Sequence, residues 1–184
     1  MDTRRPHVFA PVAIGRPPRT VRLDLLLESI ACGLLQYYEV RRPPVPILQM
    51  LGQPPRGLER DLDLCVALPY GEAAFVRLLS GQGVVFVNPE LPLPRQRFAS
   101  ARNMLRGDYH SPRGRALGLS GTAPVPHSAA EEYYARCLLM PVSLLPLRWP
   151  AMTAEELADL FAVPPDAAAA RLAELNGGRA YSQN

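Results

Sequence analysis

Two groups of polar residues, on two successive predicted helices, are the side chains here that could do chemistry at one site. They are Arg102, Asn103, Arg106 and His110 in the first group, and His127, Glu131 and Glu132 in the second. Arg102 and Arg106 are one helical turn apart and therefore share a face. A guanidinium offers no lone pair to a metal ion, but it binds carboxylates through two parallel hydrogen bonds. The spacing favours an arginine–glutamate bridge between the two helices, with the alternative that both arginines reach solvent through an open cleft.

A rebuilt metal site is a second interpretation of the same residues. The ligands it could use are Asp108, His110, His127, Glu131 and Glu132. His127 and Glu131 would share a face if their helix begins early. His110, however, lies two turns beyond Arg102 and would face the same way as two cations, which repel a divalent ion. We therefore expect no metal and no cofactor.

Hydrophobic periodicity predicts the elements that position these residues. Three β-type runs, over 62–68, 73–79 and 84–87, are separated by turn residues and predict a three-stranded antiparallel sheet. Residues 111–127 are rich in Gly, Pro and Ser and are expected to form a loop. Helices are expected over 21–40, 45–52, 94–109, 128–140, 154–163 and 165–177, and Thr153 with Glu156 predicts a capping box at the start of the fifth. The fold class is α+β.

Length and charge suggest one globular domain with a basic leader. The chain has 184 residues, of which 48% are hydrophobic and 20% charged. The net charge is +3, and residues 1–22 hold five arginines against one aspartate, so direct nucleic-acid binding is expected only through this leader. No apolar run could cross a bilayer, which predicts a cytoplasmic protein. The expected parts are a flexible leader (1–20), a main domain (21–150), a helix pair packed on it (151–178) and a tail (179–184).

Other kinds of site find little support in the residues. The three cysteines are odd in number and widely spaced, so we expect all of them to be reduced core residues. Gly81-Gln82-Gly83 lies between two predicted strands rather than before a helix, which argues against a phosphate loop. The last two helices have helix-turn-helix spacing, but Asp166 followed by four alanines cannot read a base edge.

Residues 88–110 resemble the ImmA/IrrE family of zinc metallopeptidases. In that family a strand ending in Val-Asn precedes R-R-F-T-x-A-H-E-x-G-H-x-x-x-H on a helix. Asn88, Arg95, Arg97, Phe98 and Ala101 fall in register with this pattern. Segments 40–52, 131–141 and 154–175 are similar to three further family motifs in the same order, so the resemblance spans residues 22–176. It implies a zincin-like domain with a C-terminal helical pair.

In this register the residues for catalysis are missing. Arg102 and Arg106 stand where the family has its first two histidines, Asn103 stands where it has the catalytic glutamate, and His110 matches the trailing histidine. The third ligand position falls near Ala130 or Ser128. Because arginine binds no metal and asparagine takes no proton from water, the resemblance implies an inactive member.

Active members cleave helix-turn-helix repressors and so regulate transcription. The resemblance therefore implies a protein-binding or regulatory module whose partner is a protein such as a repressor. Two alternatives remain: a metallopeptidase with a rebuilt site, and a structural subunit of a larger assembly.

Overall fold

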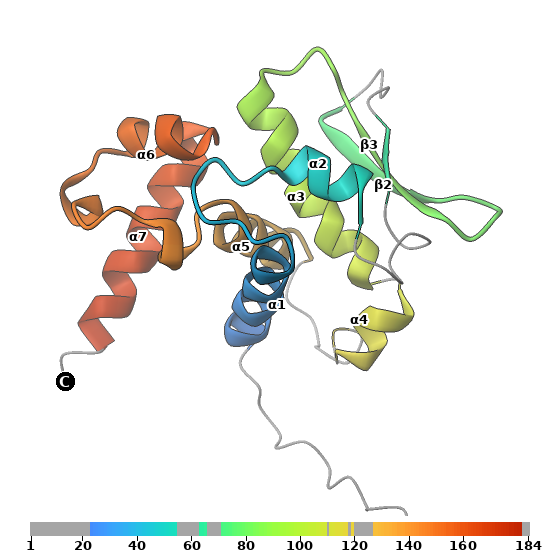
Figure 1. Cartoon of the computed structure of the whole chain (residues 1–184), viewed down its shortest axis with the longest axis horizontal. Helices are drawn as coiled ribbons and strands as arrows, with labels where there is room; N and C mark the ends of the chain where they lie inside the picture. The colour runs from blue at the N-terminus through green and yellow to red at the C-terminus, as the bar shows by residue number, and fades with distance from the viewer. Residues whose placement is uncertain are drawn as a thin grey trace, which may run out of the picture.

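The computed structural model describes residues 23–54, 63–65, 71–109, 111–117, 119 and 127–181, and its fold is α+β (Figure 1). Two single-turn 3-10 helices, Val142–Leu144 and Trp149–Ala151, connect α5 to α6. In this described part no helix is long and apolar enough to cross a membrane. The main elements are α1 (Leu23–Tyr37), α2 (Ile47–Gly52), β1 (Leu64–Cys65), β2 (Ala73–Arg77), β3 (Gly83–Val87), α3 (Leu93–Tyr109), α4 (Pro112–Ala116), α5 (His127–Leu139), α6 (Ala154–Phe161) and α7 (Pro165–Tyr181).

The sheet is mixed, with the strand order β1-β3-β2. β2 and β3 form an antiparallel hairpin in which Ala73 lies opposite Val87, whereas β1 runs parallel to β3 with Leu64 opposite Val85. The prediction of an antiparallel meander is therefore wrong for the first strand. The physical reason is that β3 is a continuous apolar run, and such a run is best buried in the middle of a sheet. β2 is left as an edge strand.

Two helix predictions also differ from the structure. The predicted loop 111–127 contains the short helix α4, where the Ser111 hydroxyl accepts a hydrogen bond from the backbone N–H of Gly114 at 2.9 Å. A capping serine followed by Pro112 is a favourable helix start. At the other end of the chain, α7 continues through Gly177-Gly178 to Tyr181, so the predicted helix end is wrong. A glycine inside a helix costs only about 1 kcal/mol, which does not by itself end the helix.

Gly114 is also a point of close backbone approach. A Cβ atom built at this position would overlap the backbone carbonyl of Asp108, at the end of α3. Only glycine therefore lets α4 fold back onto the C-terminal turn of α3. This contact links the short helix to the one that carries the predicted site.

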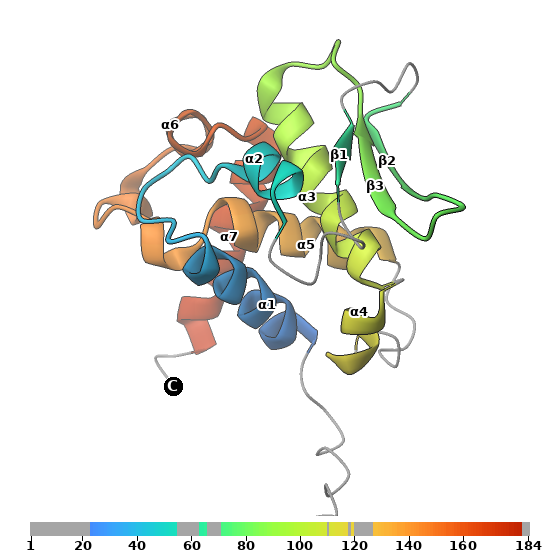
Figure 2. The same cartoon turned by 45° about the vertical axis from the view of Figure 1, so that its right-hand side comes forward.

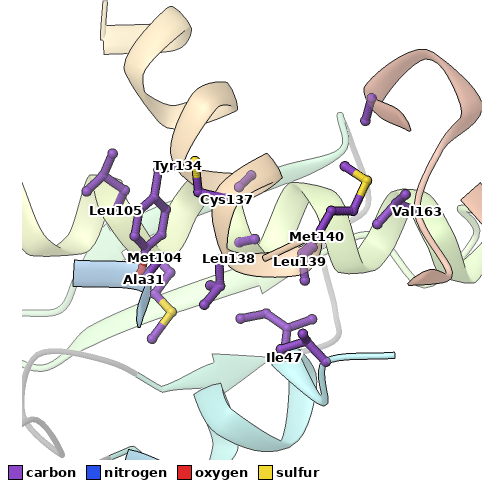
Figure 3. Close-up of a cluster of buried hydrophobic side chains, with 14 of the residues drawn as sticks. Ala31, Ile47, Met104, Leu105, Tyr134, Cys137, Leu138, Leu139, Met140 and Val163 are labelled. Atoms are coloured by element: carbon purple, nitrogen blue, oxygen red, sulfur yellow. The ribbon is translucent and has the colours of Figure 1, made fainter. Parts of the chain in front are cut away.

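One hydrophobic core joins all the helical layers, and α5 lies at its centre (Figures 1 and 2). The sheet lies at one end of the molecule and α6 and α7 at the other, with α3 and α5 between them. In Figure 3, Tyr134 and Leu138 of α5 lie close to Met104 of α3 and Ala31 of α1. Phe161 at the end of α6 belongs to the same core, as do two alanines near the start of α7.

The capping box predicted at the start of α6 is confirmed. The Thr153 side chain accepts a hydrogen bond from the backbone N–H of Glu156, and the Glu156 carboxylate accepts one from the backbone N–H of Thr153. The prediction for the cysteines holds for Cys137, which is buried, but is wrong for Cys32, which is exposed. The reason is that Cys32 lies beside the stripe of α1 that packs on the core, rather than within it.

Candidate functional site

Arg106 and Glu131 form a bidentate ion pair between α3 and α5. Nε of Arg106 donates to Oε1 of Glu131 at 2.9 Å, and Nη2 donates to Oε2 at 2.7 Å. The Glu131 side chain is 1% exposed and the Arg106 side chain 41%, so the carboxylate is fully enclosed and the guanidinium covers it from the solvent side. The hydrogen bonds to Glu131 raise the pKa of Arg106, against a smaller lowering by burial. Both helices are joined at this point by charge rather than by apolar packing.

Arg102 lies one turn before Arg106 but meets a different element. Its Nη1 atom is 3.6 Å from Oε2 of Glu72, the residue that precedes β2. The Nε atom of Arg102 is buried and has no hydrogen-bond partner among the described residues. The two arginines therefore share a helix face, as predicted from their spacing, yet one faces α5 and the other faces the edge of the sheet.

Asn103 is buried, at 5% exposed, and its side chain serves its own helix. Nδ2 donates to the backbone carbonyl of Ala99 at 2.9 Å, while Oδ1 has no hydrogen-bond partner within the described ranges. The amide therefore lies inside the protein and is not displayed to a substrate.

The remaining predicted site residues are Glu132, the two candidate ligand positions Ala130 and Ser128, and the two histidines. The Glu132 carboxylate lies 3.7 Å from Nη1 of Arg136 on the same helix and contacts neither Arg102 nor Arg106. Ala130 is buried and Ser128 is exposed, so the carboxylate that reaches α3 comes from Glu131. His110 lies outside the described residues; His127 begins α5, and its side chain lies outside them as well.

A polar cavity of about 360 Å³ lies beside Arg102, between α3, α5 and the start of α7. Its charged lining consists of three arginines and three carboxylates, and the rest is apolar. The residues that line it are Glu72, Arg95, Phe98, Arg102, Glu132, Arg136, Pro164, Asp166, Ala167 and Ala170. Sequence reasoning missed Glu72, Arg136 and Asp166, because they come from three separate elements and carry no shared local pattern.

A neighbouring arginine, Arg97, holds the frame around this cavity. Its guanidinium is buried and donates to three backbone carbonyls, at 2.9 Å to Ala162, 2.7 Å to Val45 and 3.3 Å to Phe161. Burial lowers the pKa of Arg97. Ala162 is the left-handed residue that ends α6, so Arg97 ties α3 both to the α6–α7 turn and to the segment before α2. The hydrogen bonds from Arg97 to the α6–α7 turn therefore help to position the start of α7, which lines the cavity.

A second cavity, of about 260 Å³, lies between α1, α5 and α7 and is mostly apolar. Cys32 and Cys137 both line it, together with the buried Arg171. Nη1 of Arg171 lies 3.5 Å from Sγ of Cys137, and its Nε donates to the carbonyl of Met140 at 3.3 Å. Burial nevertheless raises the pKa of Cys137 to about 11. At neutral pH this thiol is therefore protonated and behaves as a core residue.

Within the described ranges, no three His, Cys, Asp or Glu side chains gather closely enough to hold a metal ion. Both carboxylate oxygens of Glu131 are already occupied by Arg106. No protein-family model matches the sequence, and no curated protein is detectably similar to it. The arginines of this region are of a kind that can hold carboxylates through paired hydrogen bonds, as Arg106 does with Glu131.

Proposed function

We propose that this protein is a catalytically silent relative of the ImmA/IrrE peptidases that binds a protein partner and regulates it without cleaving it. The observation that carries the proposal is the bidentate contact between Arg106 and Glu131. By the resemblance, a metal ion would join α3 and α5 at this place. Here an ion pair joins the same two helices. Because a guanidinium is not a metal ligand, a metal site at this place would require a different residue at position 106.

The chemistry of the other aligned positions supports the same proposal. Arg102 offers only hydrogen-bond donors and has no lone pair to give to a metal ion. Asn103 stands where the resemblance places the general base, but an amide takes no proton from water. Its Nδ2 group is also engaged within α3. Metal binding and base catalysis are thus both lost from these positions.

The surface beside the cavity supports a polypeptide partner. β2 lies at one edge of the described sheet, directly after Glu72 of the cavity lining. Val76 in β2 is exposed, and so are Leu78 and Leu79 just beyond it, which gives this edge an apolar character. A helix-turn-helix repressor is the partner class that the resemblance suggests.

Metal analysis and a binding experiment together test the proposal. The protein, purified without chelators, should contain no stoichiometric zinc by elemental analysis. A helix-turn-helix protein encoded beside its gene should bind it in titration calorimetry and remain intact by mass spectrometry. One tightly held zinc ion per molecule, or cleavage of that partner, would show that the protein is a working peptidase.

A restored variant provides the control for the metal analysis. The combined substitutions Arg102→His, Asn103→Glu and Arg106→His remove both cations and release Glu131 from its ion pair. Glu131 is then available as a third ligand from α5, and we expect this variant to take up zinc at least weakly. If the restored variant binds no zinc while the wild-type protein does, the aligned positions are not the metal site.

A further inference from the structure

We propose that the cavity beside Arg102 receives a carboxylate of the bound polypeptide, with Arg102 as the group that holds it. The inference rests on the proposed function and names the chemistry that the partner presents. Three arginines line the cavity, and their hydrogen-bond donors are used to different extents.

Two of these arginines are already engaged by carboxylates. Arg95 donates to Oε1 of Glu72 at 3.3 Å and lies 3.9 Å from Asp166. Arg136 contacts Oε1 of Glu174 through Nε at 2.8 Å and through Nη2 at 2.7 Å. Their charges are therefore neutralised within the protein. A ligand would have to displace an existing carboxylate in order to bind either of them.

Arg102 differs from both. In the part of the chain that the structure describes, its one ionic contact, Nη1 to Glu72, is 3.6 Å long and too far for a hydrogen bond, and its Nε donor is buried without an acceptor. A guanidinium carries five N–H donors, and a buried donor that stays unpaired costs free energy. The side chain is 26% exposed, so part of it remains open to a ligand. Arg102 is thus the cation of this cavity with unused binding capacity.

Arg106 shows how a carboxylate would engage such a side chain. One turn further along the same face of α3, it uses Nε and Nη2 to hold both oxygens of Glu131. The same pair of donors on Arg102 is unfilled. Nε of Arg102 is enclosed, so a carboxylate in the cavity would instead reach the two terminal nitrogens, Nη1 and Nη2, through a pair of parallel hydrogen bonds.

The rest of the lining limits what carries the carboxylate. Phe98, one turn before Arg102, and Pro164, Ala167 and Ala170 form an apolar wall whose small residues leave the space open. About 360 Å³ is at the lower end of ligand-binding cavities. It suits one amino-acid residue better than a cofactor. The group is therefore a carboxylate on a short stem, either a Glu or Asp side chain or the carboxyl terminus of a polypeptide.

The carboxylates in the lining do not exclude such a ligand. Glu72 is shared between Arg95 and Arg102, and Glu132 lies by Arg136. Asp166 is 72% exposed, so water screens its charge. With equal numbers of positive and negative groups, the cavity has no strong net field, and hydrogen-bond geometry at Arg102 decides the preference.

The experiment uses three small probes on the full-length protein, followed by NMR of the arginine Nε–H signals. N-acetylglutamate α-amide presents a side-chain carboxylate, N-acetyl-leucine presents a C-terminal one, and N-acetylglutamine amide presents neither. One of the two acids should shift the Arg102 signal saturably, and the better acid identifies the source of the carboxylate. The uncharged probe should leave the signal in place. If neither acid shifts it, or if all three shift it equally, the inference is wrong.

Variants give a second measurement that does not depend on the probes. Arg102→Gln should weaken binding of the protein partner by about tenfold or more. Arg102→Lys should weaken it by less, since lysine keeps the charge but loses the paired N–H donors of the guanidinium. Arg42→Gln, an exposed arginine that does not line the cavity, is the matched control and should leave binding unchanged. Because Arg102 makes no hydrogen bond to any other described residue, Arg102→Gln should keep the melting temperature of the wild type. A partner that binds both Arg102 variants with unchanged affinity overturns this inference and leaves the proposed function standing. Finding one zinc ion per molecule in the purified protein would instead contradict the proposed function itself.

Discussion

The Arg106–Glu131 pair can be tested by a double-mutant cycle made of Arg106→Met, Glu131→Gln and the two together. Methionine keeps the apolar stem of Arg106 and removes only the guanidinium. Breaking a fully buried ion pair costs about 3–5 kcal/mol, but the Arg106 side chain is 41% exposed. Water can therefore reach the stranded Glu131 carboxylate, and we expect about 2–3 kcal/mol for Arg106→Met. Glutamine keeps the shape and one hydrogen bond, so Glu131→Gln should cost about 1–2 kcal/mol.

Urea unfolding of the four proteins measures these free energies. The double variant should cost less than the sum of the two single changes, by about 1–2 kcal/mol, because the second change removes a group already stranded by the first. Additive single effects below about 0.5 kcal/mol would refute the reasoning. The contact would then be a surface pair of no structural weight, and the proposed function would lose its main support.

Three further predictions concern the frame of the site and the thiols. Arg97→Met should lower the free energy of unfolding by about 2–4 kcal/mol, because three backbone carbonyls lose their donor. Arg97→Lys should restore little of this in urea unfolding, and a full rescue would show that charge alone matters. Gly114→Ala should destabilise by about 1–3 kcal/mol through the overlap with the end of α3, while Gly33→Ala, exposed and with open space around it, should stabilise α1 by up to about 1 kcal/mol. Equal effects of the two glycine changes on the melting temperature would contradict the close approach. Because burial raises the pKa of Cys137 to about 11, a thiol reagent at pH 8 should modify Cys32 and leave Cys137 unmodified until the protein is unfolded. The proton held by Cys137 contributes stability that is present below the ordinary thiol pKa of 9.0 and lost as the pH rises toward about 11; rapid labelling of both thiols in the native protein would contradict its burial.

The helices were the part of the fold most open to prediction from the sequence. Apolar residues spaced at helical intervals predicted α1, α3 and α5 to within a few residues, and Thr153 with Glu156 predicted the start of α6. These signals are local, since a helix buries one face whatever lies opposite it. The same periodicity put Arg102 and Arg106 on one face of α3. It left open which of them meets a glutamate on α5.

The sheet and the pairing of the charges depended on tertiary structure. The hydrophobic pattern marks β3 as a strand suited to the middle of the sheet, but it does not tell which strands pair with β3 or in which direction they run. In the same way, Arg106 meets Glu131 rather than Glu132 because core residues such as Tyr134 and Met104 set the rotation of α5 against α3. Sequence alone determined which residues share a face. Only the packed core, which fixes the distance and rotation between elements far apart in the sequence, decided that Arg106 is paired and that Arg102 is left with donors to offer.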